Sequence, residues 1–214
     1  MKAIIFTDLD ASLLHEETFS CSEIIDTLKS LMSDGVLIIP NTSKTEVETR
    51  NVLKSLDFNT PFIIENGAKL CDIQNGFQFI GETDKEFGLE ASELEIRLGK
   101  LDDLSFLSDF QPIIKLSHEI ASQILGLTGQ GLDEALKRKY RRLYRYVGPK
   151  SKIPFWHEVL FKVGLSLSQG GRVFAVSGPH NKATPIEWLL QNFVLMGQQL
   201  PKIIAIGDSN NDKP

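Results

Sequence analysis

The chain has 214 residues, 42% of them hydrophobic, and a formal net charge of -5. This size and composition fit a globular protein of one or two domains, and the acidic balance argues against broad nucleic-acid binding, which needs a basic surface. No segment approaches the ~18 apolar residues of a membrane span, and the N-terminus lacks the pattern of a signal peptide. The only cysteines, Cys21 and Cys71, have no metal-binding or redox spacing. These features predict a cytoplasmic protein with reduced thiols.

The N-terminal part of the chain alternates apolar runs with amphipathic stretches. Residues 3–6, 36–39 and 62–64 are short apolar runs, typical of strands that are buried on both faces. Between them lie two stretches with helical spacing, preceded by capping-box patterns at residues 20–23 and 45–48. This β-α-β-α-β order predicts an α/β fold with a parallel, Rossmann-like sheet and right-handed crossovers.

The middle of the chain has a different pattern. Asn75-Gly76 separates two short apolar runs and predicts a β-hairpin. From residue 83 to residue 168 the sequence is more polar and its strands are less regular. We interpret this segment, residues 83–168, as an inserted second domain.

After the inserted segment the pattern of the core resumes. The sequence predicts a strand over 172–176, a helix over 183–195 and a strand over 203–206. The predicted core domain therefore consists of residues 1–82 and 169–214.

Acidic and hydroxyl residues follow the predicted core strands where those strands end. Asp8 and Asp10 come after the first strand, Thr42 and Ser43 after the second, and Asp208 after the last. In an open parallel sheet, sites form at the carboxyl ends of the strands, so residues far apart in sequence can converge there. We expect one functional site at this edge of the sheet.

The carboxylates have a chemical and a plainer interpretation. Asp8 and Asp10 can supply a nucleophile and a general acid–base, or can simply begin a loop. Asp208 and Asp212 offer the hard oxygen ligands that suit Mg²⁺, but Asp, Ser and Asn also favour turns and helix N-caps.

The hydroxyl residues and one lysine could bind an anion. Thr42 and Ser43 stand at a helix start, where they could hold phosphate oxygens or act only as N-caps. Lys182 precedes the predicted helix over 183–195 and could neutralise phosphate charge or be solvated. None of these residues identifies a function alone.

Together, four motifs resemble those of the haloacid dehalogenase superfamily of phosphatases. Phe6-Thr-Asp-Leu-Asp-Ala-Ser12 resembles its Asp-x-Asp-Gly-Thr motif, Thr42 or Ser43 its hydroxyl residue, and Lys182 its lysine. Residues 207–212 match its Gly-Asp-Ser-x-Asn-Asp motif in full. Glu65-Asn-Gly67 is typical of the branch with a large α/β cap. The resemblance covers nearly the whole chain and implies a Rossmann-like core with an inserted C2-type cap.

This resemblance implies roles for the matching residues. Asp8 would attack phosphorus and form an aspartyl phosphate, while Asp10 would act as general acid and then as general base. Asp212 would orient Lys182 or a metal-bound water. The implied Mg²⁺ ligands are Asp8, Asp10 through its backbone carbonyl, Asp208 and Asp212. The implied phosphate-holding residues are Thr42, Ser43 and Lys182.

Within the superfamily, the chain resembles the mannosyl-3-phosphoglycerate phosphatase family most. Residues 42–45, 61–67 and 170–172, and the stretch 135–138 with Tyr140, carry this resemblance. It implies a small anionic substrate, mannosyl-3-phosphoglycerate or a related sugar phosphate. The dense basic stretch over 137–145 could collect such a substrate or be a solvated helix face. The implied substrate-binding residues are Thr42, Ser43, Lys44, Arg138 and Arg172.

Some features of the sequence depart from the family's motifs. Ala11 and Ser12 replace the family's Gly-Thr, and Lys139 stands where the cap signature usually has an acid. If position 11 needs a glycine conformation, alanine there costs of order 1 kcal/mol. The sequence ends at Pro214, whereas the superfamily continues with further elements, so the strand over 203–206 would lie at a sheet edge that a partner chain could cover.

Three functions are therefore compatible with the sequence. The first is a phosphatase, the second a degenerate relative that only binds a phosphorylated ligand or a partner, and the third a phosphomutase. Ala11 and the short C-terminus favour the second, whereas the intact Asp8, Asp10 and Lys182 oppose it. The same aspartyl phosphate would serve a mutase. No membrane partner is expected, and nucleic acid is the least favoured ligand.

Overall fold

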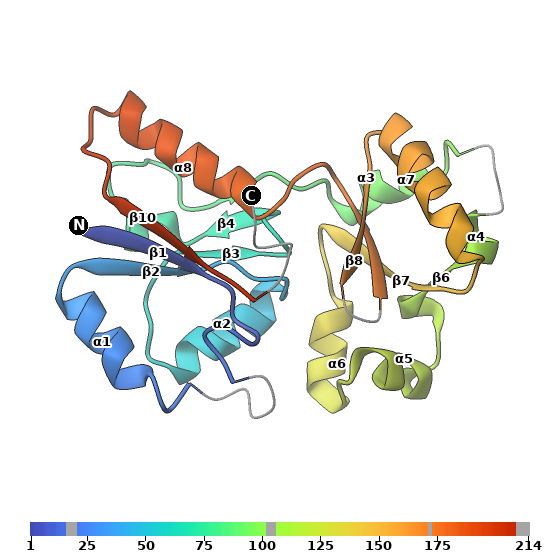
Figure 1. The fold of residues 1–214 in the computed structure, drawn as a ribbon, viewed down its shortest axis with the longest axis horizontal. Coiled ribbons are helices and arrows are strands. Elements are labelled where there is room, and N and C mark those ends of the chain that lie inside the picture. Colours follow the sequence, from blue (N-terminus) through green and yellow to red (C-terminus); the bar gives the residue numbers. More distant parts are fainter. Residues whose placement is uncertain (16–20, 102–105, 171–172, 209–214) are drawn as a thin grey trace. The chain divides into compact units, whose positions relative to one another are not determined.

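A computed structural model describes residues 1–15, 21–101, 106–170 and 173–208 and divides the chain into two compact units (Figure 1). The first unit is Met1–Phe87 with His180–Pro214, and the second is Gly88–Pro179. The elements of the first unit are β1 (Ala3–Thr7), α1 (Ile25–Ser33), β2 (Val36–Pro40), α2 (Glu46–Ser55), β3 (Phe62–Ile64), β4 (Lys69–Cys71), the 3₁₀ turn η1 (Ile73–Asn75), β5 (Lys85–Glu86), α8 (Ala183–Leu195) and β10 (Lys202–Ile206).

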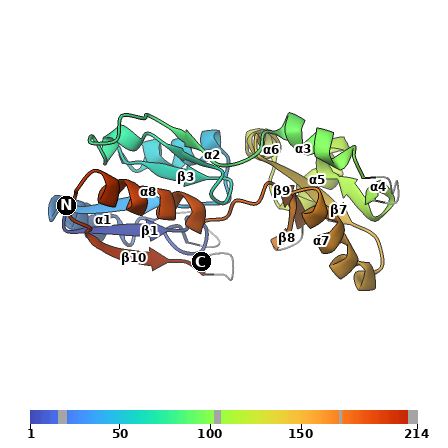
Figure 2. The same ribbon diagram turned by 90° about the horizontal axis from the view of Figure 1, so that it is seen from above.

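The predicted parallel sheet is confirmed for β10, β1 and β2. β1 lies between the other two strands, with Phe6 opposite Ile39 on one side and Ala205 on the other. Figure 1 shows α8 on one side of these strands and α1 on the other, and the view from above in Figure 2 has α8 in front and α1 behind. Buried apolar side chains from β1, β2 and α8 pack into one cluster, which includes Ile4, Phe6, Ile39, Leu189 and Phe193.

The third predicted strand occurs where expected, but it does not extend the parallel ladder. A single parallel bridge, Asn41 to Ile63, links it to the end of β2, and β3 instead pairs antiparallel with β4. The turn between β3 and β4 contains three consecutive residues with positive φ, Glu65 (45°), Asn66 (58°) and Gly67 (93°). Their left-handed backbone reverses the chain immediately after β3.

The hairpin predicted at Asn75-Gly76 is wrong. Residues 73–75 form η1, and Gly76 follows at its end. Phe77 and Ile80 are buried in the core cluster, where the Phe77 ring lies edge-to-face on Phe193. Burial of these side chains against α8 therefore prevails over strand pairing.

Helix starts are partly as predicted. The capping box of α2 is confirmed, because the Thr45 side chain accepts from the backbone of Glu48 while the Glu48 carboxylate accepts from the backbone of Thr45. The box predicted at residues 20–23 begins at Ser20, outside the described residues. α1 starts at Ile25, and its N-cap residue Ile24 gives no side-chain cap.

The second unit is built on a four-stranded antiparallel sheet in the order β6-β7-β9-β8. A cluster around Trp156, Phe110 and Tyr144 packs on one face, and a smaller cluster around Ile113 and Leu132 packs on the other. The elements of this unit are α3 (Ala91–Leu98), α4 (Phe106–Asp109), β6 (Phe110–Pro112), η2 (Ile113–Lys115), α5 (His118–Leu125), α6 (Gly129–Leu136), β7 (Arg141–Tyr146), η3 (Lys150–Lys152), α7 (Ile153–Lys162), β8 (Ser166–Gly170) and β9 (Val173–Ser177).

The strand predicted over 172–176 belongs to the second unit, not to the core. It corresponds to β9, which pairs antiparallel with β7 and β8 and buries Phe174 and Val176 in the Trp156 cluster. A short apolar run indicates a buried strand but not the sheet that it joins. The second unit therefore spans residues 88–179 rather than 83–168, and β5, which pairs with β4, remains in the first unit.

β10 lies at an edge of its sheet, because among the described strands only β1 pairs with it. The prediction that a partner chain covers this edge stays a prediction. Within the described part of the chain, no helix is both long enough and apolar enough to cross a membrane.

Candidate active site

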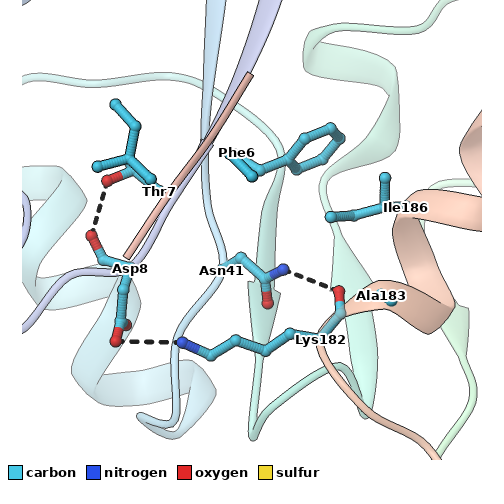
Figure 3. A pocket seen from close by; sticks show the side chains of 9 residues that line it. Phe6, Thr7, Asp8, Asn41, Lys182, Ala183 and Ile186 are labelled. Carbon is cyan, nitrogen blue, oxygen red and sulfur yellow. Dashed lines mark hydrogen bonds and ion pairs between the residues drawn. The ribbon is translucent and has the colours of Figure 1, made fainter. Parts of the chain in front are cut away.

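Asp8 stands at the carboxyl end of β1 and is held by the neighbouring strand. Its backbone N–H donates to the carbonyl of Ile206 in β10 at 3.0 Å. Its side-chain Oδ1 accepts from the N–H of Leu9 at 2.8 Å, and its Oδ2 lies 3.1 Å from Nζ of Lys182 (Figure 3). The Asp8 and Lys182 side chains are only 11% and 7% exposed, so this ion pair is largely shielded from water.

Lys182 immediately precedes α8, and its backbone is fixed from two directions. The Asn181 Oδ1 accepts from the N–H groups of Ala183 at 2.9 Å and Thr184 at 3.1 Å, which caps the helix start. The carbonyl of Lys182 accepts from Nδ2 of Asn41 at 2.9 Å (Figure 3). The lysine side chain therefore extends towards Asp8 from a well-anchored main chain.

Gly67 allows the segment before α8 to approach the turn after β3. Its φ is +93°, and a Cβ at this position would lie 1.8 Å from the carbonyl oxygen of Asn181. No side chain can be accommodated at that distance from a backbone atom. Gly67 therefore allows Asn181, the residue before Lys182, to pack directly against the turn after β3.

Asn41 is a site residue that the sequence analysis missed. It follows β2, is 5% exposed, and lines a cavity of about 50 Å³ together with Asp8 and Lys182. Its Oδ1 is buried and has no hydrogen-bond partner among the residues that the structure describes. The available signal was its position, because Asn41 is the first polar residue at the end of β2, one residue before Thr42.

Thr42 organises the loop after β2. It is fully buried, its N–H donates to the carbonyl of Ile63, and its Oγ1 accepts from the N–H of Lys44 at 3.2 Å. Ser43 beside it is half-buried. Nζ of Lys44 lies 2.8 Å from Oδ1 of Asp10, so the structure forms a second lysine–aspartate pair in this unit.

The residue after Asp10 has an unusual backbone. Ala11 has a φ of +54°, in the left-handed region that favours glycine. The structure thus confirms the conformation that the family's glycine suggested, and alanine occupies it with strain.

The Mg²⁺ ligands implied by the family are only partly described. Asp208 is exposed and stands two residues after Ile206, the residue that accepts the Asp8 N–H, whereas Asp212 lies outside the described residues. Among the described residues, no group of three or more His, Cys, Asp or Glu side chains is placed to hold a metal. Asp8 and Asp208 nevertheless fit Mg²⁺ in chemistry, because this ion takes one or two carboxylates and keeps several waters.

The remaining predicted substrate residues belong to the second unit. Arg138 lies between α6 and β7, and its carbonyl accepts from Nη1 of Arg142 at 3.0 Å. Arg172 is outside the described residues. The basic stretch is not a helix face, because Arg141, Arg142 and Arg145 lie on β7.

Comparisons with known proteins identify the fold and the family of this chain. Residues 5–84 match the family model of haloacid dehalogenase-like hydrolases. The fold resembles that of a phosphatase of the haloalkanoate superfamily from Bacteroides thetaiotaomicron, with a TM-score of 0.67 and 18% identity over 100% of this chain and 80% of that one. The chain therefore has the fold of the haloacid dehalogenase-like hydrolases, with a cap domain.

Two relatives identify the family to which the chain belongs within this superfamily. The mannosyl-3-phosphoglycerate phosphatase of Pyrococcus horikoshii is 31% identical over 100% of this chain and 86% of its own length. The glucosyl-3-phosphoglycerate/mannosyl-3-phosphoglycerate phosphatase of Methanococcoides burtonii is 29% identical over 100% of this chain and 81% of its own. The chain belongs to the mannosyl-3-phosphoglycerate phosphatase family.

Proposed function

We propose that this chain hydrolyses the phosphomonoester of mannosyl-3-phosphoglycerate or glucosyl-3-phosphoglycerate, with Asp8 as the nucleophile and Mg²⁺ as cofactor. The observation that carries the proposal is the shielded Asp8–Lys182 pair at the carboxyl end of β1. A carboxylate held next to a lysine offers a nucleophile and a positive charge for phosphate oxygens at one place. The substrates after which the two relatives are named supply the substrate class.

The proposed reaction has two steps. In the first, a carboxylate oxygen of Asp8 attacks phosphorus, the bond to the sugar-acid oxygen breaks, and Asp10 gives its proton to that oxygen. In the second, Asp10 takes a proton from a water molecule, whose oxygen attacks phosphorus and releases inorganic phosphate from Asp8. Lys182 neutralises charge on the phosphate oxygens in both steps.

Lys44 lies beside Asp10, the proposed general acid and base. Its Nζ is 2.8 Å from Oδ1 of Asp10. A lysine at this position offers a positive charge to an anionic substrate, so we assign Lys44 to substrate binding together with Thr42 and Ser43.

Magnesium would be held by the carboxylates of Asp8 and Asp208, with the Asp10 carbonyl and Asp212 as the remaining protein groups of the family pattern. When bound, it neutralises negative charge on the phosphoryl group. We also assign Arg138 and Arg172 to recognition of the anionic sugar acid. A cytoplasmic location fits the two buried cysteines, which are both free thiols.

The test is a substrate panel with Mg²⁺. Glycosyl-3-phosphoglycerates and simple sugar phosphates are incubated with the wild type and with Asp8→Asn, and released phosphate is measured. We expect release from the glycosyl-3-phosphoglycerates and loss of at least about a thousandfold in Asp8→Asn. Asp34→Asn is the matched control, because Asp34 is exposed and precedes β2, at the opposite end of the strand from the site.

The outcomes separate the alternatives. Release that persists in Asp8→Asn would overturn the role of Asp8. Phosphate that moves to a second sugar hydroxyl rather than to water would indicate a mutase. Binding of the substrates without any turnover would indicate the degenerate, binding-only relative.

A further inference from the structure

The second unit contains a cavity of about 340 Å³ whose described residues all belong to that unit. Its walls come from the C-terminal end of α3, the start of α4, β6, η2 and β7. The volume falls in the range of about 300–1,000 Å³ that is usual for small-molecule sites. The apolar part of the wall consists of Leu98, Leu101, Phe106, Leu107, Pro112 and Ile114.

Four polar side chains line the same cavity: Arg142, Lys115, Glu95 and Tyr144. Among the lining residues that the structure describes, two cations and one anion leave a net positive charge of one. Arg142 reaches Glu95 at 3.2 Å, but the Glu95 side chain is 66% exposed, so this pair is the weak surface kind that a ligand can replace.

Tyr144 supplies a neutral donor. The residue is 4% exposed and packs among Phe106 and Phe110, yet within the described ranges no residue shares a hydrogen bond with its hydroxyl. Burial raises the pKa of Tyr144 to about 12, so the phenol keeps its proton at neutral pH. A phenol hydroxyl that borders a cavity and has no hydrogen-bond partner among the described residues is a group to which a ligand can bond.

We propose that this cavity binds a small amphipathic monocarboxylate, with its apolar body among Leu98, Phe106 and Ile114 and its carboxylate at Arg142 and the Tyr144 hydroxyl. The guanidinium fork matches the two oxygens of a carboxylate. One negative charge balances the single net positive charge of the described lining residues.

Other ligand classes fit the lining less well. A sugar phosphate carries many hydroxyl groups, which would lose their hydrogen bonds to water against six apolar side chains. Against the described lining residues, a phosphate dianion would leave one negative charge unbalanced. The chemistry of this cavity thus differs from that of the substrate proposed for Asp8.

The experiment is calorimetric titration of the full chain with octanoate, beside 1-octanol and acetate. We expect saturable binding of one octanoate per chain, and at least about tenfold weaker binding of each of the other two, because one lacks the charge and the other the apolar body. Tyr144→Phe should weaken octanoate binding about threefold to tenfold, since it removes one hydrogen bond and keeps the ring.

Tyr146→Phe is the matched control. It lies on the same strand, its hydroxyl donates to the Pro149 carbonyl, and it does not line the cavity, so its octanoate affinity should equal that of the wild type. Unfolding midpoints of both variants check that each is folded. Absence of saturable octanoate binding, equal binding of octanol, or unchanged affinity in a folded Tyr144→Phe would overturn the proposal.

Discussion

At the residue scale, the backbone at Ala11 shows how this chain departs from its family. A left-handed φ of +54° costs an alanine about 1–2 kcal/mol relative to the right-handed region. The family resemblance showed that Ala11 replaces a glycine, and the structure shows that this alanine has a left-handed backbone conformation. The strain lies one residue from Asp10 and does not remove any of the side chains proposed for catalysis.

The Ala11→Gly variant should therefore be more stable than the wild type. Relief of about 1–2 kcal/mol of strain is offset by about 0.4–1 kcal/mol from the larger freedom of glycine in the unfolded chain, which leaves a gain of roughly 0.5–1 kcal/mol. Urea unfolding measures this gain as a higher free energy of unfolding. Ala91→Gly, at the start of α3, is the control and should destabilise, and a loss of stability in both variants would contradict the strain at Ala11.

Asn41 should act as a positioning residue. Asn41→Ala removes the hydrogen bond to the Lys182 carbonyl. A buried carbonyl oxygen that loses its donor destabilises the folded chain by about 1–3 kcal/mol. We expect kcat for phosphate release to fall about tenfold or more, with a smaller change in KM, because Lys182 acts on the charge that develops during transfer. Asn75→Ala, at an exposed asparagine, is the control. An unchanged kcat would show that Lys182 does not depend on Asn41.

At the element scale, an ion-pair network ties α2 to the β4 region. Lys69 Nζ lies 3.0 Å from Glu46 and 2.9 Å from Asp84, and Arg50 contacts Glu46 and Asp72. Burial acts to raise the pKa values of Glu46 and Asp84, but their hydrogen bonds and charge contacts with the cations outweigh it, so both values are lowered. Lowered carboxyl pKa values mean that the network stabilises the folded chain when these groups are ionised.

This network should make stability sensitive to acid. Its contribution is complete above the ordinary pKa values of 4.5 for Glu46 and 3.8 for Asp84, and is lost as the pH falls below them. The free energy of unfolding should therefore drop between about pH 5 and pH 3, and less steeply in Lys69→Met. Lys54→Met, at an exposed lysine of α2, is the control. Equal slopes in wild type and Lys69→Met would contradict the network.

Local signals predicted the elements of the first unit better than their pairing. The apolar runs of β1, β2 and β3, and the capping box at Thr45, were sufficient to place strands and a helix start. They could not show that Phe77 buries against α8 rather than in a hairpin, because that contact joins residues more than a hundred positions apart. They also could not show that position 67 must lack a side chain, because this requirement comes from the contact of Gly67 with Asn181.

At the scale of the whole molecule, the two-unit organisation was predicted, but both boundaries of the second unit lie further along the chain than predicted. A buried strand such as β9 has the same apolar pattern in either sheet, so only its pairing with β7 and β8 assigns it to the second unit. More of the candidate site was predicted. The structure places Asp8 and Lys182 3.1 Å apart, and Lys44 2.8 Å from Asp10. Asn41 required the three-dimensional structure.

The most direct test of the central proposal is to trap the phosphorylated enzyme. Wild-type chain is mixed with mannosyl-3-phosphoglycerate and Mg²⁺, quenched in acid within milliseconds to seconds, digested and analysed by mass spectrometry. The proposal predicts one phosphoryl group on the peptide that contains Asp8, absent in Asp8→Asn and decaying as phosphate is released. Full turnover with no phosphoryl group on Asp8 at any quench time would contradict it.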